Sequence, residues 1–97
     1  MAIGVYFHPE SLNASQHDDV IRQLEAVGAG HPTGRQLHVS FGSGDQLQIF
    51  EIWDSAEDMQ AFGPTLMPIL AAAGIKPGEP SVELVHNAIV DQPTHVN

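Results

Sequence analysis

Glu51 and Trp53 are separated by one residue in the stretch IFEIWDS, residues 50–56, where apolar and polar side chains alternate as in a strand. Residues two apart in a strand point to the same face, so this alternation places a carboxylate beside the only Trp of the chain. A carboxylate in surroundings that exclude water can serve as a general base. The pattern therefore predicts that this face lines an enclosed small-molecule site, in which Trp53 stacks on an aromatic ligand or fills the end of the cavity.

Six histidines are the other side chains suited to acid–base chemistry or metal binding near neutral pH. His38 is the candidate base beside Glu51, whose alternative role is a structural hydrogen bond to His38 or Tyr6. His8, His38 and His86 could join Glu51 in a metal site, but no HxH or HxxxH spacing supports one, and we expect neither a metal nor a cofactor. Three histidines are expected to be exposed on a helix, a loop and the tail: His17, His31 and His95.

Composition excludes several classes of function. The chain has no cysteine, which rules out disulfides, thiolate metal sites and a Cys nucleophile. Three basic residues stand against twelve acidic ones, too few to neutralise the phosphates of a nucleic acid. No apolar run approaches the roughly 20 residues of a membrane span, and the first residues do not resemble a signal peptide. We expect a cytoplasmic protein that binds neither nucleic acid nor membranes.

The elements that must position these residues follow from periodicity. Alternation predicts strands over residues 2–8, 36–41, 46–53 and 80–90. Helical spacing predicts one helix between Asn13 and Gly28 and a second between Ser55 and Gly74. The order β-α-β-β-α-β predicts a single α+β domain over residues 1–97, a ferredoxin-like sheet with both helices on one face.

Local signals refine the two helices. Asn13 and Gln16 predict a capping box, and Ser55 with Asp58 resembles another. The first helix presents an apolar stripe: Val20, Ile21, Leu24 and Val27. In the second helix we expect a break near Gly63-Pro64, because a proline in a helix interior removes a backbone hydrogen bond.

The faces of the strands can be assigned by asking which side is uniformly apolar. On this criterion the helices cover these residues: Ile3, Val5, Phe7, Leu37, Val39, Phe41, Phe50 and Ile52. The opposite face is mixed, and we expect the sheet of a second copy to cover it and to enclose a pocket. The candidate ligand-binding residues on it are Tyr6, His8, His38, Ser40, Ile49, Glu51 and Trp53. His86 is assigned to the pocket from a strand with two acceptable faces, and Phe62 and Met67 are candidate wall residues.

In the order and spacing of several short motifs, the chain resembles the antibiotic-biosynthesis-monooxygenase-like (ABM-like) proteins of the dimeric α+β barrel superfamily. The motifs are His38-Val39, IWDSAEDMQAF (52–62), LMPILAAAGI (66–75) and VHNAIV (85–90), and the resemblance covers essentially the whole chain. It implies a homodimer whose two sheets form a barrel with a cavity in each subunit. Some members are cofactor-independent monooxygenases, and others degrade haem.

Two positions depart from the pattern of those enzymes. Ile49 lies four residues before Trp53, in the region where the better-known monooxygenases place an Asn. The haem-degrading members use a His on the second helix, where this chain has Phe62-Gly63-Pro64. We therefore expect first a homodimer that binds an apolar or aromatic small molecule. The alternatives are a cofactor-independent monooxygenase of phenolic or polyketide-like substrates, with His38 or Glu51 as base, and a structural homodimer with an incidental cavity.

Overall fold

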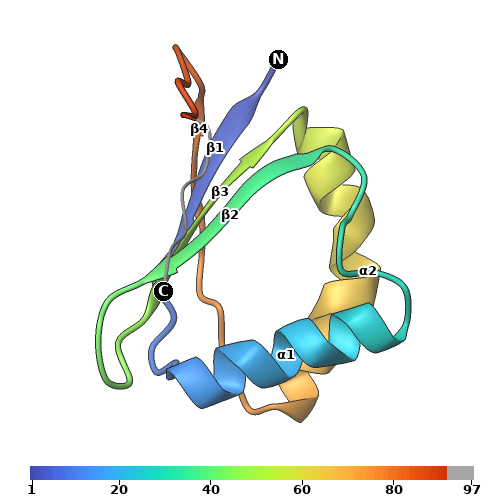
Figure 1. The fold of residues 1–97 in the computed structure, drawn as a ribbon, viewed down its shortest axis with the longest axis vertical. Coiled ribbons are helices and arrows are strands. Elements are labelled where there is room, and N and C mark those ends of the chain that lie inside the picture. Colours follow the sequence, from blue (N-terminus) through green and yellow to red (C-terminus); the bar gives the residue numbers. More distant parts are fainter. Residues whose placement is uncertain (92–97) are drawn as a thin grey trace.

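The predicted order of elements is confirmed by the computed structural model, which describes residues 1–91. The elements are β1 (Ile3–Phe7), α1 (Ala14–Ala26), β2 (Arg35–Phe41), β3 (Gln48–Trp53), α2 (Ala56–Ala72) and β4 (Ser81–Leu84). The four strands form one antiparallel sheet in the order β2-β3-β1-β4. Both helices lie on the same side of this sheet (Figure 1), so the α+β, ferredoxin-like fold class is confirmed. None of the described helices is both long and apolar enough to cross a membrane.

The predicted helix boundaries are confirmed by their caps. The side chain of Asn13 accepts from the backbone N–H of Gln16 at 2.8 Å, and the side chain of Gln16 accepts from the N–H of Asn13 at 3.0 Å. Gly28 follows α1 with φ = 77°, the left-handed conformation that glycine adopts at low cost after a helix. At the start of α2, the hydroxyl of Ser55 accepts from the N–H of Asp58 at 3.1 Å. These contacts satisfy orphan donors and fix where each helix begins.

The apolar stripe of α1 is shorter than the sequence indicates. Val20 and Leu24 are buried in the core between the helices and the sheet. Val27 is 66% exposed, because it is the C-cap residue and the chain has already left the helical path there. The expectation that Val27 belongs to the buried face was wrong.

The expected break in α2 was also wrong, since the helix runs without interruption from Ala56 to Ala72 with two prolines inside it. Pro64 and Pro68 are four residues apart and both exposed, so they share the outer face of the helix. The carbonyl groups that lose their helical partner belong to Gln60 and Pro64, which are also exposed. Water can therefore donate hydrogen bonds to these two carbonyl groups in place of the missing N–H groups, and the helix continues.

Strand β4 is shorter than the predicted 80–90. Leu84 lies opposite Ile3, the first residue of β1, and the N–H of Val85 donates to the carbonyl of Ala2 at 3.0 Å. Beyond that point β1 offers no further residues to pair with, so the ladder ends. The predicted frayed tail at 91–97, including His95, lies outside the described residues except for Asp91.

The register shows that the assignment of faces was right for β1 and wrong for β2 and β3. Val5 lies opposite Glu51, and Glu51 lies opposite His38, and residues directly opposite one another share a face. The buried core joins Val5 and Trp53 in one cluster on the helix side. The helix side therefore carries His38, Ile49, Glu51 and Trp53, whereas the open face carries Leu37, Val39, Phe41, Phe50 and Ile52. In β3 both faces are apolar enough to be buried, and in β2 the more apolar face, with Leu37, Val39 and Phe41, is the open one, so hydrophobicity alone led to the wrong assignment.

Candidate functional site

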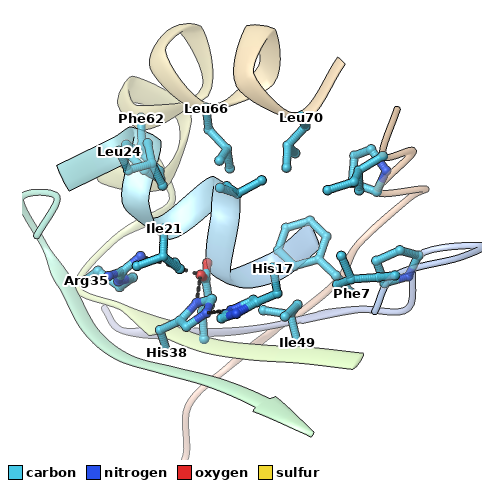
Figure 2. A pocket seen from close by; sticks show the side chains of 16 residues that line it. Phe7, His17, Ile21, Leu24, Arg35, His38, Ile49, Phe62, Leu66 and Leu70 are labelled. Atoms are coloured by element: carbon cyan, nitrogen blue, oxygen red, sulfur yellow. Dashed lines mark hydrogen bonds and ion pairs between the residues drawn. The ribbon is translucent and has the colours of Figure 1, made fainter. Parts of the chain in front are cut away.

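A partly open cavity of about 90 Å³ lies between the helices and the sheet (Figure 2). Most of its lining is apolar and comes from both helices, β1 and β3: Phe7, Leu24, Ile49, Phe62, Leu66 and Leu70. A dry cavity of about 150 Å³ holds benzene. This one therefore accepts a single ring only after neighbouring side chains shift, and nothing larger fits without further opening.

Glu51 forms the polar end of this cavity and is 8% exposed. Its Oε1 accepts from the indole Nε1–H of Trp53 at 3.0 Å, and its Oε2 lies 2.6 Å from His38 Nδ1. Arg35 adds a cation, with Nη1 3.8 Å from Oε2. The carboxylate and the Trp thus point the same way because each satisfies the other inside the core.

Arg35 reaches the cavity because of an irregularity in β2. The register shifts between Arg35 and Leu37, so that Arg35 lies opposite Trp53 while Leu37 lies opposite Ile52. Without this bulge, simple alternation would turn Arg35 to the open face together with Leu37. Its second guanidinium nitrogen donates to the carbonyl of Gly30 at 3.1 Å, which holds the side chain in place.

His17, expected to be exposed on a helix, was placed wrongly, since its side chain is 15% exposed and lines the cavity. Its Nε2 lies 2.9 Å from Nε2 of His38, and its Nδ1 lies 3.1 Å from Oδ1 of Asp18. Figure 2 shows the chain of contacts running from His17 through His38 to the carboxylate. The sequence held a signal for this, because His17 stands three and seven residues before Val20 and Leu24 and so belongs to the same helical stripe.

Four of the predicted site residues line the cavity together: His38, Ile49, Glu51 and Phe62. Trp53 does not line the cavity but lies buried behind the residues that do. It is 1% exposed, and its ring lies 5.7 Å from that of Phe62 at 42°. The residues that sequence reasoning missed are His17, Arg35 and the apolar residues of both helices, because the pocket was expected on the other face.

The remaining candidates lie elsewhere. Tyr6 and His86 line a shallow depression on the open face, where the Tyr6 hydroxyl donates to Oε1 of Gln48. His8 is exposed, with its ring 6.4 Å from that of Tyr6. Ser40 lies opposite Ile49 but is exposed, and Met67 is exposed on the outer side of α2.

The metal set that sequence reasoning considered is not assembled. His38 and Glu51 line the cavity, whereas His8 and His86 do not. Among residues 1–91, no group of three or more histidines and carboxylates is arranged to hold an ion.

Comparison with solved structures gives close agreement in fold. A proposed antibiotic biosynthesis monooxygenase from Chloroflexus aurantiacus J-10-fl matches with a TM-score of 0.65 and 18% identity, covering 93% of this chain and 98% of that one. A mutant of SnoaB, a cofactor-independent oxygenase from Streptomyces nogalater, matches with a TM-score of 0.64 and 11% identity over 93% and 98% of the two chains. NE2512, a protein of unknown function from Nitrosomonas europaea, matches with a TM-score of 0.58 and 16% identity over 97% and 96%.

No protein-family model and no curated protein matches the sequence. The structural matches nevertheless confirm the resemblance at the level of the fold: the chain has the α+β fold of the ABM structures. At these identities the likeness carries the fold alone, and function must be argued from the cavity.

Proposed function

We propose that this chain binds a compact, largely apolar small molecule in the cavity between its helices and its sheet. The observation that carries this proposal is the composition of the cavity, an apolar chamber closed at one end by the polar side chains of His17, His38, Arg35 and Glu51. Small-molecule sites are typically apolar clefts in which a few convergent polar groups fix the orientation of the ligand. Ile49 supports binding over oxygenation. It lines the cavity with an aliphatic side chain, in the region where the better-known monooxygenases place an Asn.

Benzene, a neutral single-ring probe, tests this proposal. Binding should perturb the NMR methyl signals of Leu24 and Leu66 and raise the melting temperature, since a ligand that binds only the folded state stabilises it. Leu66→Trp should fill the cavity and abolish binding. Met67→Trp is the matched control, because the adjacent side chain is 49% exposed and its enlargement leaves the cavity unchanged. Methyl signals that do not move at saturating probe would reject the site.

A second candidate function is cofactor-independent oxygenation, and the contact between His38 and Glu51 favours it. A carboxylate oxygen 2.6 Å from Nδ1 holds the N–H there, so the other ring nitrogen, Nε2, becomes the proton acceptor once His17, whose Nε2 lies 2.9 Å from it, turns aside. The pair would remove a proton from an activated methylene group, and the carbanion would react with O₂ to give a ketone and water: R₂CH₂ + O₂ → R₂C=O + H₂O. Oxygen uptake with a single-ring substrate that carries an activated methylene group, at one O₂ per ketone, tests this candidate.

We also propose that the open face of the sheet pairs with a second copy of the chain. Two apolar side chains on this face, Val39 and Phe41, are each about two fifths exposed. A patch of this kind is rarely left in water by a monomeric protein. If the dimer forms but no ligand enters the cavity, the chain is instead a structural homodimer with an incidental cavity.

A further inference from the structure

Most of the polar side chains that line the cavity already have one another as partners. Four polar residues are present in the lining: His17, Arg35, His38 and Glu51. Nδ1 of His38 lies 2.6 Å from Oε2 of Glu51, and its Nε2 lies 2.9 Å from Nε2 of His17. Nδ1 of His17 lies 3.1 Å from Oδ1 of Asp18. All four ring nitrogens are therefore in contact with a partner, whichever tautomer each ring adopts.

The carboxylate of Glu51 is occupied as well. Its Oε1 accepts from the indole N–H of Trp53 at 3.0 Å, and its Oε2 contacts His38. Apart from Arg35, the other described residues of the lining have apolar side chains. Arg35 is therefore the lining side chain that remains to form a hydrogen bond with a ligand.

Arg35 has N–H donors to spare. A guanidinium group carries five N–H donors and no acceptor. Within residues 1–91, Nη2 donates to the carbonyl of Gly30 at 3.1 Å, and no other protein acceptor lies within hydrogen-bond distance of the group. Nη1 is 3.8 Å from Oε2 of Glu51, which is close enough for an ion pair but too far for a hydrogen bond. Because the side chain is 13% exposed, a ligand or an ordered water must satisfy the remaining donors.

The positive charge of Arg35, in contrast, is already balanced. Figure 2 shows its guanidinium group beside the carboxylate of Glu51 at one end of the chamber. A ligand that brought a second negative charge to Arg35 would also approach this carboxylate, and it would lose its hydration on entering an apolar cavity. A neutral hydrogen-bond acceptor incurs neither the repulsion nor the loss of an ion's hydration.

We infer that the ligand is an uncharged single-ring molecule with one hydrogen-bond acceptor, a ring nitrogen or a carbonyl oxygen, that accepts from an N–H of Arg35. The ring occupies the apolar part of the chamber. Arg35 then selects the ligand, while the histidines and Glu51 hold one another in place. The inference rests on the proposed ligand-binding function and names the chemical class of the ligand.

Benzene and pyridine form a matched pair of probes, because they have nearly the same size and pyridine adds one acceptor and no donor. An acceptor buried without a partner loses its hydrogen bonds to water, so pyridine would then bind about tenfold more weakly than benzene. A hydrogen bond from a charged donor offsets this loss, and we expect the two Kd values to agree within about threefold at a pH of about 8, where pyridine is uncharged.

A substitution of Arg35 separates the acceptor from the ring. Arg35→Met keeps a long side chain but removes the donors, so it should weaken pyridine about tenfold and change benzene less than about threefold. Arg22→Met is the matched control, because Arg22 is exposed on α1, where Nη2 lies 3.2 Å from Oδ1 of Asp19. It should bind both probes as the wild type does.

The wild-type protein provides a test that does not depend on whether Arg35→Met folds. The chain has two arginines, so the side-chain N–H signals of Arg35 can be compared with those of Arg22 in the same NMR sample. Pyridine should move an Arg35 N–H proton downfield, as a hydrogen bond does, whereas neither probe should move the signals of Arg22.

Benzonitrile and benzoate test the charge of the ligand, because both carry an acceptor on one ring and only benzoate is an anion. Benzonitrile should bind about tenfold more tightly than benzoate or better. Tighter binding of benzoate would overturn the neutral class.

The outcomes distinguish the inference from the proposed function. If benzene binds but pyridine is about tenfold weaker and leaves the Arg35 signals unmoved, the inference is wrong and the proposed function stands. If neither probe moves the methyl signals of Leu24 and Leu66, both are wrong.

Discussion

Trp53 donates its indole N–H to Oε1 of Glu51, 3.0 Å away and two residues back on the same strand. Trp53→Phe removes this donor while keeping an aromatic ring in a position that is 1% exposed. The carboxylate oxygen is then left without one of its partners, which costs about 1–3 kcal/mol. We expect the free energy of unfolding in urea to fall by this amount with the fold retained, as judged by circular dichroism. A change below about 0.5 kcal/mol would show that water satisfies Glu51 as well as the indole does.

Glu51→Gln tests how much the negative charge of the same side chain contributes to stability. A neutral amide no longer attracts the Arg35 cation, and its NH₂ group, which only donates, replaces one of the two oxygens that contact Trp53 and His38. We expect a loss of about 1–3 kcal/mol in stability.

Asp54→Asn is the control for that substitution. Asp54 is exposed and accepts from Nε2 of Gln36 at 2.7 Å, so its loss of charge should change stability by less than about 0.5 kcal/mol. Under the oxygenase candidate, Glu51→Gln should also abolish oxygen uptake while benzene affinity stays within a few-fold. Full turnover in Glu51→Gln would exclude the carboxylate from the chemistry.

Two glycines should respond in opposite directions to the same change to alanine. At Gly63, inside α2, an added methyl group meets open space and the backbone is helical, so Gly63→Ala should stabilise by about 0.5–1 kcal/mol. At Gly34, φ is +86° and the methyl group would overlap the carboxylate of Asp58, so Gly34→Ala should destabilise by about 1–3 kcal/mol. Thermal melts compare the two variants directly. A destabilising Gly63→Ala would contradict the uninterrupted helix.

The proposed dimer predicts a mass twice the 10.4 kDa of one chain in light scattering at micromolar concentration. Val39→Lys combined with Phe41→Lys places two charges on the open face and should produce a folded monomer. Val27→Lys is the control, because Val27 is equally apolar and more exposed but lies at the end of α1. A wild-type chain that stays monomeric would remove the interface.

Periodicity predicted the elements well because caps and strand alternation are local. Asn13, Ser55 and Gly28 act on their own neighbours, so their roles could be read without knowing the fold. The prolines of α2 led to a wrong prediction because they, too, were interpreted from their sequence neighbours alone. Their cost depends on whether water reaches the freed carbonyl groups, and only the packed structure decides which side of the helix faces out.

The position of the site depended on information that is not local. Whether Glu51 faces the helices is set by its register against Val5, and a shift of one residue would reverse every side chain of β3. The bulge that turns Arg35 inward is likewise invisible in the alternation of β2. The residues were therefore predicted better than the place where they meet.

The alternation along β3 has a consequence for regulation. Phe50 and Ile52 belong to the face proposed to meet a second copy, while Glu51 and Trp53 support the cavity on the opposite side. A ligand that moves this strand therefore acts on association as well, and sedimentation with and without benzene would measure the effect. Thermodynamic reciprocity fixes its size in both directions: because each subunit of the dimer has its own cavity, a ligand that tightens association tenfold must bind each cavity of the dimer about threefold more tightly than that of the monomer.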